Sequence, residues 1–144
     1  MKQNTENTNA FLIHISAFAG FIFPFGNIIT PLIAWQTLKD RSPFLDEHGK
    51  EAINFNISYA LYFLMFSVFA GSFFMGDFFR NFNGFNTHNH FSFHVDTDNV
   101  FGFLGLGSIA GIIYLIGMAL VIIAAFKAKE GESYKYPFTI QFIK

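Results

Sequence analysis

Three long stretches of this chain carry no Asp, Glu, Lys or Arg: residues 10–38, 52–76 and 99–126. Each exceeds the roughly 20 residues that a helix needs to cross about 30 Å of hydrocarbon. A helix in a soluble core would show a polar face every three or four residues, and these stretches mostly do not. The sequence therefore predicts an all-α integral membrane protein, a helical bundle with about three transmembrane segments in one membrane domain.

Composition excludes several other classes of protein. Only 13% of the residues are charged, against roughly 25% in an average soluble domain. The net charge of −1 gives no bulk attraction to nucleic acid, so no nucleic-acid partner is expected. The absence of cysteine removes disulfides, thiolate catalysis and iron–sulfur clusters. The lipid bilayer is the first partner that the composition predicts.

The first apolar run, residues 10–38, is interrupted by helix-breaking residues. Pro24, Gly26 and Asn27 lie together near its middle, and Pro31 follows. The helical pieces on either side would be roughly 21 and 16 Å long, so neither spans a bilayer alone. The run is either one kinked span or a helix–turn–helix that enters and returns. Side chains expected to satisfy the broken backbone are those of His14, Asn27 and Thr30.

The rest of the chain divides at its charged and polar segments. Ser42 and Pro43 predict a helix that starts in the charged connection and continues into the second span. An aromatic cluster at 134–137 in the tail suits the headgroup level. The expected order is the broken segment 10–38, connection 39–51, second span 52–76, an Asn-, Phe- and His-rich loop 77–98, third span 99–126 and tail 127–144.

Lys and Arg are unevenly distributed between these connections. The connection 39–51 carries three and the tail 127–144 four, whereas the loop 77–98 carries only Arg80. By the positive-inside rule, the connection and the C-terminus face the cytoplasm, and the His-rich loop 77–98 faces out. The apolar stretch from Phe11 to Ile15 is too short for a signal peptide, so we expect the N-terminal segment to be retained. The side on which the N-terminus lies stays open.

Several segments together resemble a known family. They are His14–Phe18, Phe23–Asn27, Pro31–Leu32, Ser42–Phe44, Asp46–Asn56 and Tyr134–Phe138. On these residues the chain resembles a bacterial family of multi-pass membrane proteins, without an assigned activity, that is similar to the twenty-kilodalton subunit of the translocon at the inner envelope of chloroplasts. This resemblance covers nearly the whole chain except the loop 77–98. It implies a component of a protein-translocation complex in the inner membrane of a bacterial cell.

Polar residues cluster where the second helix enters the bilayer. Glu47, Glu51, Asn54 and Ser58 form one stripe on one helix face. A functional interpretation is a polar track that contacts a partner helix or carries protons. The alternative is a charge cluster that fixes the depth of the helix. The candidate interaction residues of this segment are Glu47, His48, Lys50, Glu51, Asn54, Asn56 and Ser58.

Histidine gives two further candidate sites. His14 lies inside the first apolar run, and it could meet His48 only if that run folds back, so no metal site is assigned to the pair. The outer loop holds His88, His90 and His94 in a spacing that matches no common metal motif. We treat these three as weak metal candidates and expect no bound metal or cofactor.

Small residues mark a possible packing face in the third span. Gly107 and Gly111 have the spacing at which transmembrane helices approach closely, within the chain or with a partner. No catalytic triad, phosphate-binding loop or deep carboxylate pair is present in the sequence. We therefore do not expect an enzyme.

The favoured function is a small non-catalytic subunit or accessory factor of a larger membrane complex, with other membrane subunits or a second copy as partners. The alternative is a homo-oligomeric channel or transporter whose path uses the broken first segment and the stripe Glu47–Ser58. A third hypothesis is metal sensing by the outer His loop.

Overall fold

The structure is a computed structural model that describes residues 2–83 and 97–144, and every regular element in these ranges is helical. The expected all-α class is therefore confirmed for this part of the chain. Two compact units are present, unit 1 with Met1–Leu61 and Leu115–Lys144, and unit 2 with Tyr62–Tyr114. In chain order the elements are α1 (Lys2–Ile15), the 3-10 helix η1 (Ser16–Phe21), α2 (Gly26–Leu38), the 3-10 helix η2 (Lys39–Arg41), α3 (Pro43–Asn83) and α4 (Thr97–Glu130).

Two helices in the described ranges are long and apolar enough to cross a membrane. They correspond to Pro43–Ser72 in α3 and Val100–Glu130 in α4. The expectation of about three spans is not confirmed, because α1 has 14 residues and α2 has 13. At 1.5 Å per residue these helices are about 21 and 20 Å long, less than the hydrocarbon thickness of about 30 Å.

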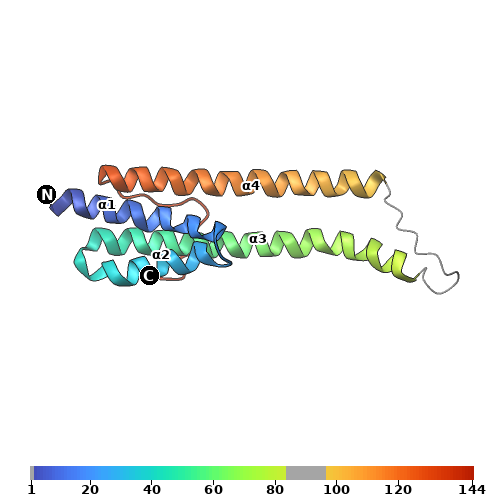
Figure 1. Cartoon of the computed structure of the whole chain (residues 1–144), viewed down its shortest axis with the longest axis horizontal. Coiled ribbons are helices and arrows are strands. Elements are labelled where there is room, and N and C mark those ends of the chain that lie inside the picture. Colours follow the sequence, from blue (N-terminus) through green and yellow to red (C-terminus); the bar gives the residue numbers. More distant parts are fainter. Residues whose placement is uncertain (1, 84–96) are drawn as a thin grey trace. The chain divides into compact units, whose positions relative to one another are not determined.

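The first apolar run folds back on itself within unit 1. In Figure 1, α1 leads from the N-terminus to the turn, and α2 leads back to the end of unit 1 at which the N-terminus lies, where α3 begins and α4 ends. Pro24 has no amide hydrogen to continue a helix, and Phe25 adopts a left-handed backbone with φ of 62°. The sequence left open a single kinked helix or two helices joined by a turn, and the structure has the two helices joined by a turn.

Glycine allows the two arms of this hairpin to approach closely at the turn. A Cβ atom on Gly26 would lie 2.4 Å from the carbonyl oxygen of Ala19, a distance that real side chains do not reach. Backbone groups satisfy the turn, with the Gly26 amide donating to Phe23 O at 3.1 Å and the Ile28 amide to Phe25 O at 2.9 Å. The expected role of His14 in this turn is wrong, because its ring bonds to other side chains.

The start of α3 agrees with its sequence signals. Ser42 caps the helix, its Oγ accepting a hydrogen bond from the Leu45 amide at 3.3 Å. Asp46 pairs with Lys50 at 2.6 Å and also accepts a hydrogen bond from the indole of Trp35 at 2.8 Å. The same carboxylate therefore ties the end of α2 to the beginning of α3.

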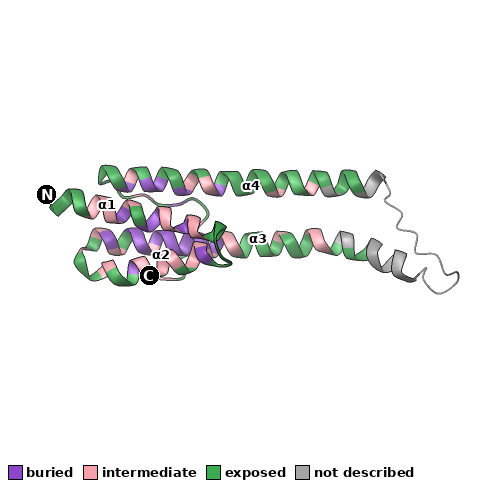
Figure 2. Ribbon diagram, in the orientation of Figure 1, coloured by how far each residue is buried: buried purple, intermediate pink, exposed green. Residues whose placement is uncertain are grey.

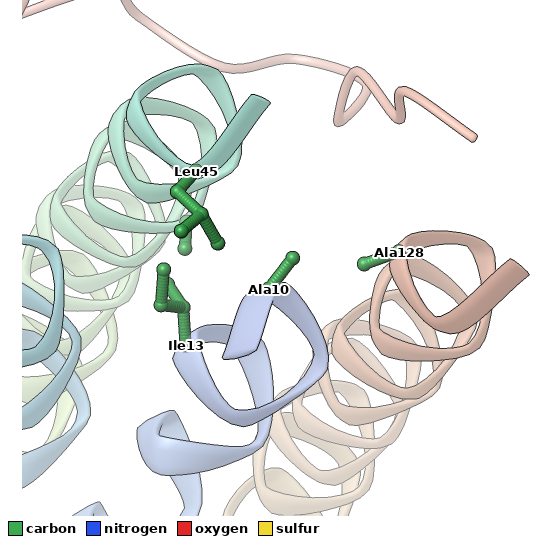
Figure 3. Packing of buried hydrophobic residues seen from close by; sticks show 5 residues of the cluster. Ala10, Ile13, Leu45 and Ala128 are labelled. Atoms are coloured by element: carbon green, nitrogen blue, oxygen red, sulfur yellow. The ribbon is translucent and has the colours of Figure 1, made fainter. Parts of the chain in front are cut away.

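The core of unit 1 lies where α1, α3 and α4 meet. Figure 3 shows Ala10 and Ile13 of α1 facing Leu45 of α3 and Ala128 of α4, and all four are fully buried. Figure 2 shows that buried residues gather on the unit 1 segments. In unit 2 the large apolar side chains described, such as Met65, are mostly exposed, as expected of helix surfaces that face lipid.

A buried polar network as the candidate functional site

Two histidines and a tyrosine from distant segments meet inside unit 1. His14 Nε2 of α1 lies 2.9 Å from His48 Nδ1 of α3, and the Tyr136 hydroxyl lies 2.9 Å from His14 Nδ1. The exposed fractions are 0% for His14, 1% for His48 and 5% for Tyr136. The two histidines were expected to meet only if the first run folds back, and in the structure the run folds back and they do meet. Because both ring nitrogens of His14 are used, its orientation is fixed from both sides.

The side chains of His14 and Tyr136 are both neutral at ordinary pH. Burial, and secondarily the neighbouring His48, lower the pKa of His14 to about 3. Burial also raises the pKa of the Tyr136 phenol well above its usual range. A neutral imidazole has one N–H, so His14 is a donor in one of its two hydrogen bonds and an acceptor in the other. The two hydrogen bonds of His14 are therefore suited to joining α1, α3 and the tail, and less suited to carrying protons.

The polar stripe of α3 is covered by the C-terminal tail, residues 131–144. At its outer end the Ser133 hydroxyl donates to the Glu47 carboxylate at 3.2 Å. One turn further, the Tyr136 amide donates to the Glu51 carboxylate at 3.4 Å. The stripe that the sequence placed on one helix face therefore binds a segment of the same chain.

Deeper along the stripe, the side chains of Asn54 and Ser58 form hydrogen bonds with the backbone of the tail. The Asn54 side chain accepts from the amides of Phe142 and Ile143, at 3.0 and 2.9 Å, and donates to the Ile143 carbonyl at 2.9 Å. The Ser58 hydroxyl accepts from the Ile140 amide at 2.8 Å. An extended segment has no internal hydrogen bonds, so these side chains provide the partners that its backbone needs.

The remaining residues predicted for this site have local roles. Lys50 pairs with Asp46 on its own helix, and the Asn56 amide donates to the Ala52 carbonyl one turn earlier at 2.8 Å. Pro31 is buried inside α2. The structure therefore brings His14, His48, Glu51, Asn54 and Ser58 into one network and leaves Lys50 and Asn56 outside it.

The sequence pattern did not predict that the tail takes part in this site. The tyrosine cluster at 134–137 was expected at the headgroup level, but Tyr136 is buried and stacks on Phe55 with ring centroids 4.0 Å apart. The signal that could have revealed it is the polar side chains of the stripe, which would be unfavourable in an apolar span unless something paired with them.

No group of three or more metal-ligating side chains occurs among the described residues. His88, His90 and His94 lie outside those residues, so their candidate metal site stays a prediction. A Cβ atom added to Gly107 or Gly111 of α4 would have nothing within 4 Å beyond the adjoining residues of its own helix. The described structure thus offers no partner within the chain for this packing face, and packing against another protein stays a prediction.

Comparison with known proteins gives one family. Residues 5–143 match the MamF/MmsF family, described as the magnetosome magnetite crystal formation protein family. No curated protein and no solved structure matches the chain. The resemblance to the chloroplast import subunit is therefore wrong as a family assignment, and a role in protein translocation has no support. The residues that suggested it, including His14, His48 and Gly49, are ones that the fold uses for packing.

Proposed function

Since the chain belongs to the magnetosome magnetite crystal formation protein family, we propose that it acts in magnetite crystal formation as a small non-catalytic membrane protein. The family match over residues 5–143 carries this proposal. Two apolar helices of spanning length support a location in the magnetosome membrane. No step of protein translocation is part of this function.

The geometry of unit 1 supports a structural rather than a catalytic role. Its buried polar groups bind one another and the chain's own tail, as His14 does with Tyr136 and Asn54 with Ile143. An enzyme site would present such groups to a substrate. Here they connect α1, α3 and the tail within unit 1.

Charge distribution supports an orientation within that membrane. The end of unit 1 that holds the start of α3 and the end of α4 carries Lys39, Arg41, Lys127 and Lys129. The positive-inside rule places this end, with the C-terminus, in the cytoplasm. The segment between α3 and α4 then faces the interior of the compartment in which magnetite forms.

A homo-oligomeric channel along the stripe Glu47–Ser58 is less consistent with this geometry. The face that would line the path is bonded to the tail at Glu51, Asn54 and Ser58. A conducting path along this face would first require the tail to leave it. We therefore retain the role of a subunit or accessory factor.

Gene replacement in a magnetite-forming bacterium that carries this chain tests the role in crystal formation. We expect deletion to change the size or number of magnetite crystals in electron micrographs, and wild-type protein to restore them. The Gly71→Ala variant, whose added Cβ has nothing within 4 Å, is the matched control and is expected to restore them equally. Unchanged crystals after deletion would rule the proposal out.

A separate experiment tests the subunit role. Tagged protein purified in mild detergent should yield a complex with a stoichiometric second protein, detected by mass spectrometry and by the mass of the complex. A homo-oligomer would instead favour the channel, and proteoliposome flux compared between wild type and Asn54→Leu would then test that function. A monomer without any partner would contradict both.

A further inference from the structure

We propose that α1, η1 and α2 form a re-entrant hairpin whose tip inserts into the acyl chains of one leaflet, the leaflet on the side of the N-terminus. The partner of this surface is lipid. This inference concerns how the chain meets the bilayer, and it does not depend on the proposed role in crystal formation.

The tip of the hairpin exposes large apolar side chains. Phe21 is 60% exposed, Ile22 84% and Phe25 71%. A soluble surface rarely gathers such residues without a partner. The turn nevertheless satisfies its backbone internally, since Ala19 O accepts the amides of Ile22 and Phe23 at 3.0 and 3.2 Å. An irregular segment can lie in hydrocarbon only if its backbone groups are hydrogen-bonded within the protein and its outward side chains are apolar, and this turn meets both conditions.

The base of the hairpin has the opposite character. The segment before Ala10 is polar, and α2 is followed directly by Lys39, Asp40 and Arg41. Trp35, near that end, donates a hydrogen bond to Asp46 and lies 5.1 Å below the Lys39 ammonium group. Tryptophan beside lysine is typical of the boundary between headgroups and hydrocarbon. The charge pattern thus places the base at a membrane surface and the tip below it.

Length decides how far the tip reaches. Trp35 lies ten positions after Phe25, which corresponds to about 15 Å of helix, or half of the roughly 30 Å hydrocarbon thickness. Both ends of the hairpin lie at the same end of unit 1, as Figure 1 shows. The tip therefore reaches the middle of the bilayer and the chain returns to the surface from which it came.

The tail, whose Tyr136 packs in one cluster with Ala17 of η1, has the same combination of paired backbone and exposed apolar side chains. Its backbone at Ile140 and Phe142 is paired with side chains of α3, while the Ile140 and Phe142 side chains remain 42% and 49% exposed. Paired backbone with apolar side chains outside again fits acyl chains. The same leaflet would hold both segments.

Sidedness tests the return of the chain. The protein has no cysteine, so single cysteines can be placed without other changes. Asn4→Cys and Glu130→Cys, both exposed positions, should react with a membrane-impermeant maleimide from the same side of oriented vesicles. Asn86→Cys, between α3 and α4, should react from the other side. Labelling of Asn4→Cys together with Asn86→Cys would mean that the first run spans, and would overturn the proposal.

Depth tests the insertion. A fluorophore attached to Ile22→Cys at the tip, or to Ile33→Cys nearer the base, is quenched by nitroxide lipids labelled near the headgroup or near the chain end. We expect the deep nitroxide to quench the tip more strongly than the shallow one, and the order to reverse at Ile33, which is 59% exposed. Phe25→Cys repeats the tip measurement if the first variant does not fold. Stronger shallow quenching at the tip, or no quenching because a protein covers it, would contradict insertion.

Discussion

His14 and His48 stand 34 positions apart in the chain, and their ring nitrogens share a hydrogen bond of 2.9 Å inside unit 1. Tyr136 bonds the second nitrogen of His14 from the other end of the sequence. One imidazole thus joins α1, α3 and the tail. The 14-residue helix α1 and the irregular tail, which are too short or too irregular to be stable alone, are thus both bound to α3 through this residue.

Removing one hydroxyl group tests the energetic weight of this junction. Tyr136→Phe keeps the ring that stacks on Phe55 and leaves His14 Nδ1 without its partner. We expect a loss of about 1–3 kcal/mol in the free energy of unfolding, measured by denaturant titration in detergent. Gln141→Ala, an exposed change in the same tail, should stay within about 0.5 kcal/mol. Equal effects from the two would show that the hydroxyl contributes nothing.

Acid should weaken the fold through His14. Its pKa in the folded protein is about 3, below the 6.5 of the unfolded chain, so the unfolded state binds more protons between these values. The free energy of unfolding therefore falls as pH drops from 6.5 towards 3. Melting temperatures of wild type should decrease across this window, and those of His14→Gln should decrease less. The same slope in both proteins would exclude His14 as the cause.

Asn54 and the end of the tail should act as one unit. Truncation after Pro137 removes the backbone groups that bond to Asn54 and leaves its buried amide without partners. Asn54→Leu is expected to destabilise the full chain and to be neutral or stabilising in the truncated chain. The double-mutant cycle should show a coupling of about 1–3 kcal/mol. Additive effects would mean that the tail is not held by this side chain.

Gly49 should tolerate no side chain. A Cβ atom there would lie 2.1 Å from Trp35 Cδ1, so Gly49→Ala forces the indole away from its hydrogen bond to Asp46. We expect a cost of about 1–3 kcal/mol and a change in the emission of the single tryptophan. Gly71→Ala, in open space on the same helix, should be neutral or slightly stabilising. An unshifted tryptophan spectrum in Gly49→Ala would argue against this packing.

Local signals allowed much of the fold to be predicted. The uncharged runs predicted α3 and α4, and the Ser42–Pro43 pair predicted where α3 begins, because hydropathy and capping are local properties. Pro24 and Gly26 predicted a break in the first run. The direction of the chain after the break depends on how α1 packs against α3, and no local pattern contains that information.

The tail could not be predicted for a different physical reason. Asn54 recognises backbone atoms of Phe142 and Ile143, and every residue except proline offers the same amide group. The identity of Phe142 and Ile143 therefore gives no sign that they pair with Asn54. The two hydrogen bonds also join residues that are far apart in the chain, with separations of 88 and 89 residues. The resemblance to the chloroplast import subunit gave a wrong function for a related reason. Residues such as Gly49 and His48, on which it rested, are needed for helix packing and do not indicate what the protein does.

The length of the hairpin has a consequence for the membrane itself. Because α1 and α2 end in the leaflet that they enter, that leaflet must accommodate two helices that the opposite leaflet does not contain. Lipids relieve such unequal crowding by bending, with the fuller leaflet on the outside of the curve. The protein should therefore concentrate where the membrane is convex on its N-terminal side, and its abundance should rise as vesicle diameter falls.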